Sequence, residues 1–160
     1  MDRVPARLAN HIKRTLTGPM WHGAALAELL EGVTPQQAAA RPIPGAHTIW
    51  EIVAHVSVWA EVARARIQGQ RTGDLTPEED WPPTGSTSEA EWAILQRRLS
   101  DSHLELARDV RHLDDATIAG AVPGLEYTVY NLLHGVIEHG TYHGGQIALL
   151  KRALASAGGS

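Results

Sequence analysis

Residues 138–146, which read EHGTYHGGQ, are the stretch of this chain that says most about its fold and its chemistry. Their two histidines, His139 and His143, are four residues apart. On a helix this spacing places both imidazoles on one face, one above the other. Neutral imidazole is a common ligand of zinc and related metals. The pair therefore has two interpretations: both rings hold one metal ion, or both are partly buried helix residues that are hydrogen-bonded to neighbours.

The surrounding hydrophobic pattern predicts a helix over 128–154 and a second one over 48–68. One stripe of the later helix holds Leu132, Val136, His139, His143, Gln146 and Leu150. The matching stripe of the earlier helix holds Thr48, Ile52, His55, Trp59 and Val62. Since the apolar members of each stripe belong in a core, the three histidines should face inward as well. A buried polar group without a partner costs roughly 1–3 kcal/mol. A shared metal ion, hydrogen bonds to carbonyls or a water-filled cleft would each meet that need.

The other elements follow from apolar spacing, capping residues and clusters of Gly and Pro. No run shows the strict alternation of a strand, so we predict an all-α chain folded as a four-helix bundle. Its single domain should cover 1–155, with 156–160 as a flexible tail. The expected order is an interrupted helical region over 4–31, a short turn from 34, helix 48–68, a long loop over 69–87 with Trp81 as a plug, helix 88–112, a connection over 114–127 and helix 128–154.

Composition excludes several classes of function. The net charge is −4 and the basic residues are dispersed, so we expect no tight binding to nucleic acid. The 160 residues include no cysteine, which excludes disulfides, thiolate metal ligands and a cysteine nucleophile. The first residues lack the apolar core of a signal peptide, and no run approaches the ~18 apolar residues of a membrane span. We therefore expect a cytoplasmic protein that does not bind membranes.

Other polar residues are candidates for accessory or structural roles. His22 follows a Gly-Pro break and is either a fourth ligand or proton carrier, or a surface or capping histidine. Gln146 either fixes a ligand or bound water, or makes an interhelical hydrogen bond. We assign Glu51 to a capping box rather than to catalysis. His11, His103 and His112 are predicted on solvated faces, and His134 is rotated about 140° off the histidine stripe.

Four glycines lie in the predicted helix 128–154, although each costs about 0.5–1 kcal/mol relative to alanine. They either allow close helix packing, which we favour for Gly135 and Gly144, or leave room for a ligand beside the histidines.

Two segments together resemble the DinB-like superfamily of damage-inducible, bacillithiol-transferase-related metalloproteins. They are IWEIVAH at 49–55 and HGTYHGGQI at 139–147. The segments GPMWHG at 18–23 and DWPP at 80–83 are similar to one branch of the same group. The resemblance covers most of the chain.

The resemblance implies a four-helix bundle that holds a metal through His55, His139 and His143. It also implies thiol-dependent transferases or isomerases as relatives, and it suggests a homodimer. An all-histidine site suits zinc or nickel. The expected partners are a low-molecular-weight thiol and a small electrophilic substrate, with hydrolysis as a less favoured reaction. The alternative function is a stress-associated metal- or ligand-binding protein without turnover.

Overall fold

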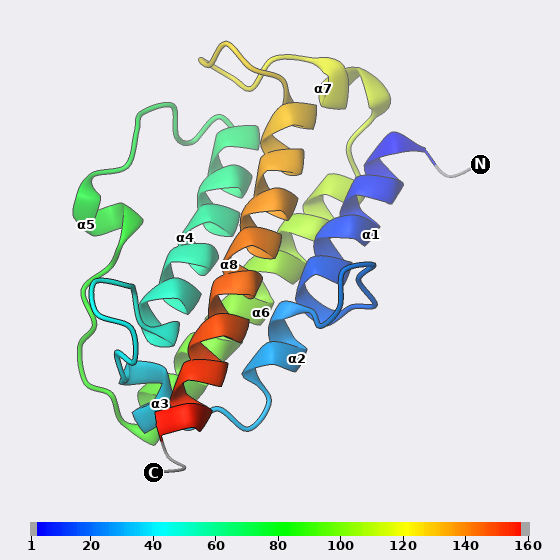
Figure 1. The fold of residues 1–160 in the computed structure, drawn as a ribbon. Helices are drawn as coiled ribbons and strands as arrows, with labels where there is room; N and C mark the ends of the chain where they lie inside the picture. The colour runs from blue at the N-terminus through cyan, green and yellow to red at the C-terminus, as the bar shows by residue number, and fades with distance from the viewer. Residues whose placement is uncertain (1–2, 158–160) are drawn as a thin grey trace.

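The computed structural model describes residues 3–157, and this range forms eight helices and no strand, as the all-α prediction requires (Figure 1). The helices are α1 (Val4–Thr17), α2 (Leu26–Leu30), α3 (Pro35–Ala39), α4 (Ile49–Ile67), α5 (Pro77–Asp80), α6 (Glu89–Arg111), α7 (Asp115–Ala119) and α8 (Val129–Ala157). Among them, none is long and apolar enough to cross a membrane.

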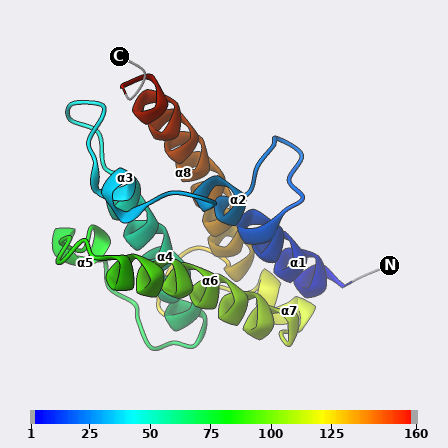
Figure 2. The ribbon, with the colours of Figure 1, turned by 90° about the horizontal axis from the view of Figure 1, so that it is seen from below.

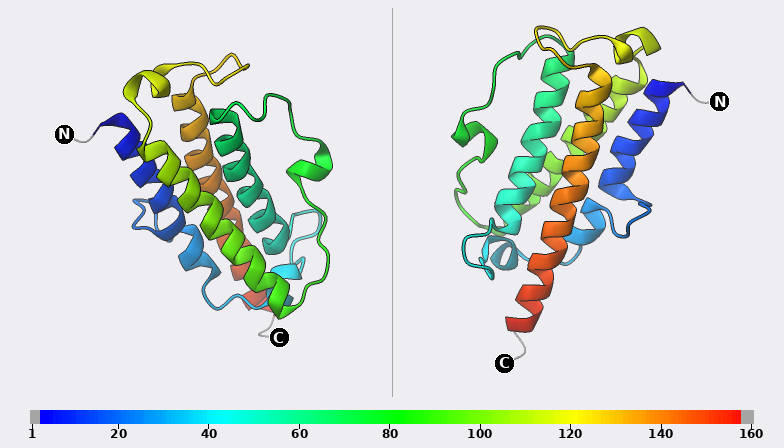
Figure 3. Two further views of the ribbon diagram at one scale, coloured as in Figure 1. Left: turned by 180° about the vertical axis from the view of Figure 1, so that it is seen from behind. Right: turned by 45° about the horizontal axis from the view of Figure 1, so that its top comes forward.

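The four longest helices pack as a closed ring in which α1 and α4 each contact both α6 and α8. Helices α4 and α8 lie side by side at the front of Figure 1, and α6 crosses the opposite side of the ring in the left panel of Figure 3. The view from below in Figure 2 shows the short helices α2, α3, α5 and α7 around this ring. Residues from both ends of the chain therefore meet in one core.

Capping boxes start the helices where the sequence predicts them. The Thr48 hydroxyl accepts from the Glu51 amide at 3.1 Å, and the Glu51 carboxylate accepts from the Thr48 amide at 2.8 Å. Thr34 starts α3 in the same way. At α6 only half of a capping box forms, since the Ser88 hydroxyl accepts from the Glu91 amide but the reciprocal bond is absent. The structure thus confirms Glu51 as a capping residue.

Four predicted segments need correction. The helical region over 4–31 is interrupted at Gly18-Pro19 as predicted, but the interruption is longer than expected: α1 ends at Thr17, and only Leu26–Leu30 resumes it. Gly18 has φ 74° and is followed by a proline without an amide hydrogen, so the helix cannot continue. The loop over 69–87 contains α5, and the connection over 114–127 contains α7. Of the predicted tail, 156 and 157 belong to α8, and 158–160 lie outside the described residues.

The core consists of two apolar clusters. One gathers around Trp50, Trp92 and Ile147, and the other around Ile12, Leu106 and Leu133. On each long helix, polar residues lie between the two clusters. We call this set the polar layer: Thr15 on α1, His55 and Ser57 on α4, Ser102 and His103 on α6, and His139 and His143 on α8. Buried polar groups need partners, so the polar layer is where a functional site is expected.

Candidate metal centre

Three histidines of the polar layer converge between α4 and α8. His55, His139 and His143 each offer one ring nitrogen, and these atoms all lie within 4.8 Å of one another. The Nε2 atoms of His55 and His139 are 2.9 Å apart. Both His55 and His143 are buried, and His139 is partly buried. The structure therefore brings together the three predicted residues in a group that could hold a metal ion.

His55 is held by the C-terminal end of α5. Its Nδ1 lies 2.7 Å from the carbonyl oxygen of Asp80, to which only a protonated ring nitrogen can donate. The Asp80 carboxylate is fixed in turn by the indole of Trp59, whose Nε1 donates to Oδ1 at 2.7 Å. With the proton on Nδ1, the lone pair of His55 Nε2 is free to bind a metal.

His143 is oriented in the same way by Gln146, one turn further along α8. Its Nδ1 lies 2.7 Å from Gln146 Oε1, and Gln146 Nε2 donates to the hydroxyl of Tyr142 at 3.1 Å. Both bonds lie within α8, so they match the ligand-fixing interpretation of Gln146 rather than the interhelical one. The Nε2 of His143 is again the nitrogen that remains for a ligand role.

Trp81 covers one side of the cluster. Its indole stacks on His55 with a centroid distance of 3.8 Å and an interplanar angle of 2°, and its other face stacks on His47 at 3.5 Å. His47 contacts Glu51 at 3.2 Å, so this stack is tied to the start of α4. Trp81, which was predicted as a plug, therefore forms a lid on the histidines themselves. It is the residue directly after α5.

The surroundings keep the three rings neutral. Burial lowers the pKa of His139 to about 3, with like-charge repulsion from His143, His55 and His103 in the same direction. Burial also lowers the pKa of His55 and that of His143, against the opposing hydrogen bonds to Asp80 and Gln146. Neutral imidazole is the form that binds metals. The cluster is thus in its metal-binding protonation state at pH 7.

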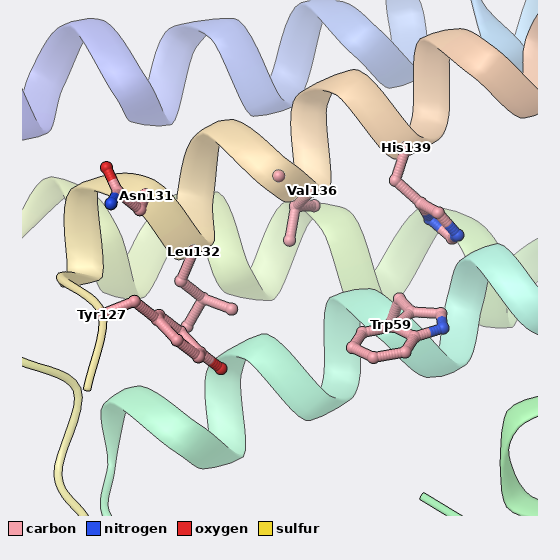
Figure 4. A pocket seen from close by; sticks show the side chains of 7 residues that line it. Trp59, Tyr127, Asn131, Leu132, Val136 and His139 are labelled. Carbon is pink, nitrogen blue, oxygen red and sulfur yellow. The ribbon is translucent and has the colours of Figure 1, made fainter. Parts of the chain in front are cut away.

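A pocket of about 370 Å³ opens beside His139, between α4 and α8. Figure 4 shows Trp59 and His139 at one end and Tyr127 and Asn131 at the other. Leu132, Gly135 and Val136 complete a largely apolar lining. A volume of this size suits a small organic molecule. Because His139 belongs to both the cluster and the pocket wall, the pocket borders the histidine cluster.

The glycines of α8 divide between the two predicted roles. A Cβ on Gly140 would come within 2.6 Å of Thr15 Cγ2, and one on Gly144 would contact Leu29 at 3.4 Å. Both positions therefore serve packing against α1 and α2. The packing interpretation is wrong for Gly135, where a Cβ would meet nothing within 4 Å and where the missing side chain leaves part of the pocket open.

The remaining histidines lie outside the cluster. His22 is exposed and does not join the three histidines, and His11 and His112 are exposed as predicted. His134 lies against Tyr130 in a tilted arrangement, with a centroid distance of 4.4 Å. The prediction for His103 is wrong, because this residue is 1% exposed. Its Nδ1 bonds the Leu99 carbonyl at 2.9 Å, whereas its Nε2 has no partner among the described residues.

Asp80 is the residue of the centre that sequence reasoning missed. Its main-chain carbonyl accepts the hydrogen bond from His55, and a main-chain group leaves no pattern of residue types in the sequence. A usable indication was nevertheless present in TPEE at 76–79, which repeats the Thr-Pro start of α3 and forms a capping box. It predicts a helical turn that ends at Asp80, with Trp81 directly after it.

The comparison with protein families agrees with this architecture. The family model of the DinB superfamily matches residues 21–147, which is most of the chain. The chain belongs to the DinB superfamily. No curated protein and no solved structure gives a match. The matched range contains α4, α5, and His139 and His143 of α8, so this DinB chain has all three histidines of the cluster inside the family region.

Proposed function

We propose that the four-helix bundle of α1, α4, α6 and α8 holds one divalent metal ion through His55, His139 and His143. The observation that carries the proposal is the convergence of three neutral imidazoles, of which His55 and His143 have their Nδ1 atoms held by Asp80 and Gln146. Such partners fix the tautomer and the orientation of ligand histidines. An all-imidazole donor set without cysteine fits zinc or nickel.

Three protein ligands leave a coordination position for a small molecule, as in catalytic rather than structural zinc sites. When bound, the metal supplies a Lewis acid that stabilises a thiolate or hydroxide near neutral pH. The chain itself contributes three uncharged ligands, an apolar pocket at His139, and the Trp81 lid over His55. Since the chain has no cysteine, any thiol must come from a cosubstrate.

The reaction proposed for this site is transfer of a low-molecular-weight thiol to a small electrophile. The thiol loses its proton to solvent, and its sulfur forms a bond to the electrophilic carbon. The leaving group departs with the electron pair of the bond that breaks. The pocket beside His139 supports this proposal because it gives the electrophile a place next to one of the three histidines.

A second candidate function is metal or ligand binding without turnover. The observation in its favour is the stacking of Trp81 on His55, which closes one side of the cluster. The two functions differ in whether an added thiol can reach the metal. Access along the pocket favours the enzyme.

Substitution with cobalt tests both candidates, since cobalt is a coloured probe for zinc sites. We expect glutathione, bacillithiol or mycothiol to change the visible cobalt spectrum of the protein. The change should be lost in His139→Ala, which removes a ligand, and kept in His22→Ala, which alters an exposed residue. If the cobalt spectrum ignores every thiol while cobalt is bound, the transferase proposal fails and binding without turnover is the better function.

A further inference from the structure

Arg66 is a buried cation without a counter-ion. It lies on α4, two turns after Trp59, and it is 6% exposed. None of the ion pairs found among residues 3–157 includes it. Arginine stays protonated in proteins, and burying a charge is unfavourable unless opposite charge or several hydrogen bonds compensate it. The environment of Arg66 therefore calls for an acceptor that the described chain supplies only in part.

Two of the residues that contact Arg66 line the pocket. Nη1 donates to the Tyr127 hydroxyl at 2.8 Å and Nη2 to the Gly73 carbonyl at 3.3 Å, and buried Nε has no partner in the described range. The guanidinium carbon lies 5.6 Å from the Trp59 ring centroid. Both Trp59 and Tyr127 line the pocket, so the charge contacts two of the residues in its wall.

The Tyr127 hydroxyl connects this charge to the pocket. Because it accepts a hydrogen bond from Arg66, its own hydrogen remains free to donate. Tyr127 is held in place by its carbonyl, which accepts from the Val122 amide at 2.9 Å. The turn between them contains Gly124 with φ 74°, where a Cβ would come within 2.7 Å of Thr72 Cγ2. In Figure 4 the Tyr127 oxygen points toward α4, at the end of the pocket away from His139.

The two ends of the pocket are well separated. Asn131 and His139 both line it and are eight residues apart on α8, which corresponds to roughly 12 Å along the helix axis. Leu132, Gly135 and Val136 provide an apolar wall between them. The shape therefore suits an elongated apolar body with a polar group at each end.

We infer that this pocket binds an elongated apolar carboxylate. Its carboxylate oxygen accepts the hydrogen bond of the Tyr127 hydroxyl, with the Arg66 charge behind it, and its other end lies at His139. The inference rests on the proposed function for the reacting end, and it names the substrate class for that site. The carboxylate completes the compensation of Arg66, and the apolar body is buried between α4 and α8.

Three octyl probes of different charge test the class of ligand in cobalt-loaded protein. Octanoate, 1-octanol and octylammonium are titrated by isothermal calorimetry, and the visible cobalt spectrum is recorded in the same samples. We expect octanoate to bind about tenfold more tightly than 1-octanol, because a charge-assisted hydrogen bond is stronger than a neutral one. Octylammonium should bind most weakly, since it meets the Arg66 charge.

Tyr127→Phe tests the recognising atom. It keeps the ring and removes the hydroxyl, so octanoate affinity should fall about tenfold and 1-octanol affinity much less. Circular dichroism of the variant checks that the helices remain. Unchanged octanoate affinity in the folded variant would overturn the role of Tyr127.

A pair of matched glycine variants tests the location. Gly135→Leu fills the pocket and should abolish binding of all three probes, whereas Gly145→Leu should leave it unchanged. Neither glycine has an atom within 4 Å of a Cβ, both lie on α8, and only Gly135 lines the pocket. Loss of binding in both variants, or in neither, would overturn the assignment to this pocket.

The remaining outcomes separate this inference from the proposed function. Equal affinities for the three probes would overturn the carboxylate class. A cobalt spectrum that changes with octanoate would place the carboxylate at the histidines and overturn the orientation. A cobalt spectrum that ignores every thiol would overturn the thiol transferase, whereas the expected ranking of the octyl probes would still support the carboxylate pocket.

Discussion

The two sides of α8 pack in opposite ways. Toward α1 and α2 the helix is closely packed, because Gly140 lets its backbone approach Thr15 and Gly144 meets Leu29. Toward α4 the same helix carries His139 and His143, and a pocket of about 370 Å³ opens beside them. One helix therefore combines a rigid packing surface with a face that has room for a metal ion and a ligand.

The comparison of the two sides shows that glycines in one helix can have different structural roles. At Gly140 the missing side chain is replaced by the γ-methyl of Thr15, so the interface is filled. At Gly135 nothing takes its place, and the space belongs to the pocket. Close packing on one side also gives the site rigidity, since ligands held on a well-packed helix keep their geometry.

The largest effect is expected from a substitution on the side of α8 that faces α4. His143→Ala should reduce bound metal from one ion per chain to none, because the two remaining imidazoles form an incomplete site. Metal analysis of protein purified without a histidine tag measures this directly. The matched control is His134→Ala, which changes a histidine on α8 outside the cluster and should keep full occupancy. Full occupancy in His143→Ala would show that the cluster is not the metal site.

A smaller effect is expected from His103, the buried histidine of the polar layer that lies on α6. Burial lowers its pKa to about 4, and the unfolded chain has the ordinary value near 6.5. Between these values the unfolded state binds more protons, so His103 stabilises the fold above pH 6.5 and this stabilisation is lost as pH falls toward 4. Replacing it should therefore flatten the decline of stability in acid.

His103→Leu tests this in urea unfolding of chelator-treated protein. The drop in the free energy of unfolding from pH 7 to pH 5 should be smaller than in the wild type by about 1–2 kcal/mol. His112→Leu, at an exposed position, should show the wild-type drop. An unaltered pH dependence in His103→Leu would mean that His103 is not the group that titrates.

The smallest effect is expected from a substitution on the side of α8 that faces α1. Gly140→Ala places a Cβ against Thr15, whose hydroxyl is already bonded to the His11 carbonyl at 3.0 Å. We expect a net loss of about 1 kcal/mol, since overpacking exceeds the gain in helix propensity. Gly145→Ala, which meets nothing within 4 Å, should gain about 0.5–1 kcal/mol. Equal changes in thermal unfolding for the two variants would contradict the packing difference between the two sides.

Much of the site was accessible from local patterns. The stripes of α4 and α8 predicted that His55, His139 and His143 face inward, and the structure brings these three together. The Thr48 capping box located the start of α4 because its hydrogen bonds span only three residues. Sequence patterns predict a structure correctly when the interactions that stabilise it join residues close together in the sequence.

Other features failed for the opposite reason. His103 was predicted on a solvated face, because the pattern of α6 does not show that the polar layer of the neighbouring helices extends to it. The Asp80 carbonyl meets His55 across 25 residues, and Arg66 meets Tyr127 across 61. Such contacts depend on how separate helices and loops pack against one another in the tertiary structure.

The sequence by itself determined the helical class, the main capping residues and the inward direction of the three histidines, because helical periodicity fixes a side chain relative to its own axis. Only the tertiary structure decided how closely those helices approach one another. That distance depends on every side chain at the interface, including the ones that glycine lacks. It brought three ring nitrogens within 4.8 Å, stacked Trp81 on His55, and left Arg66 and Tyr127 beside an open pocket.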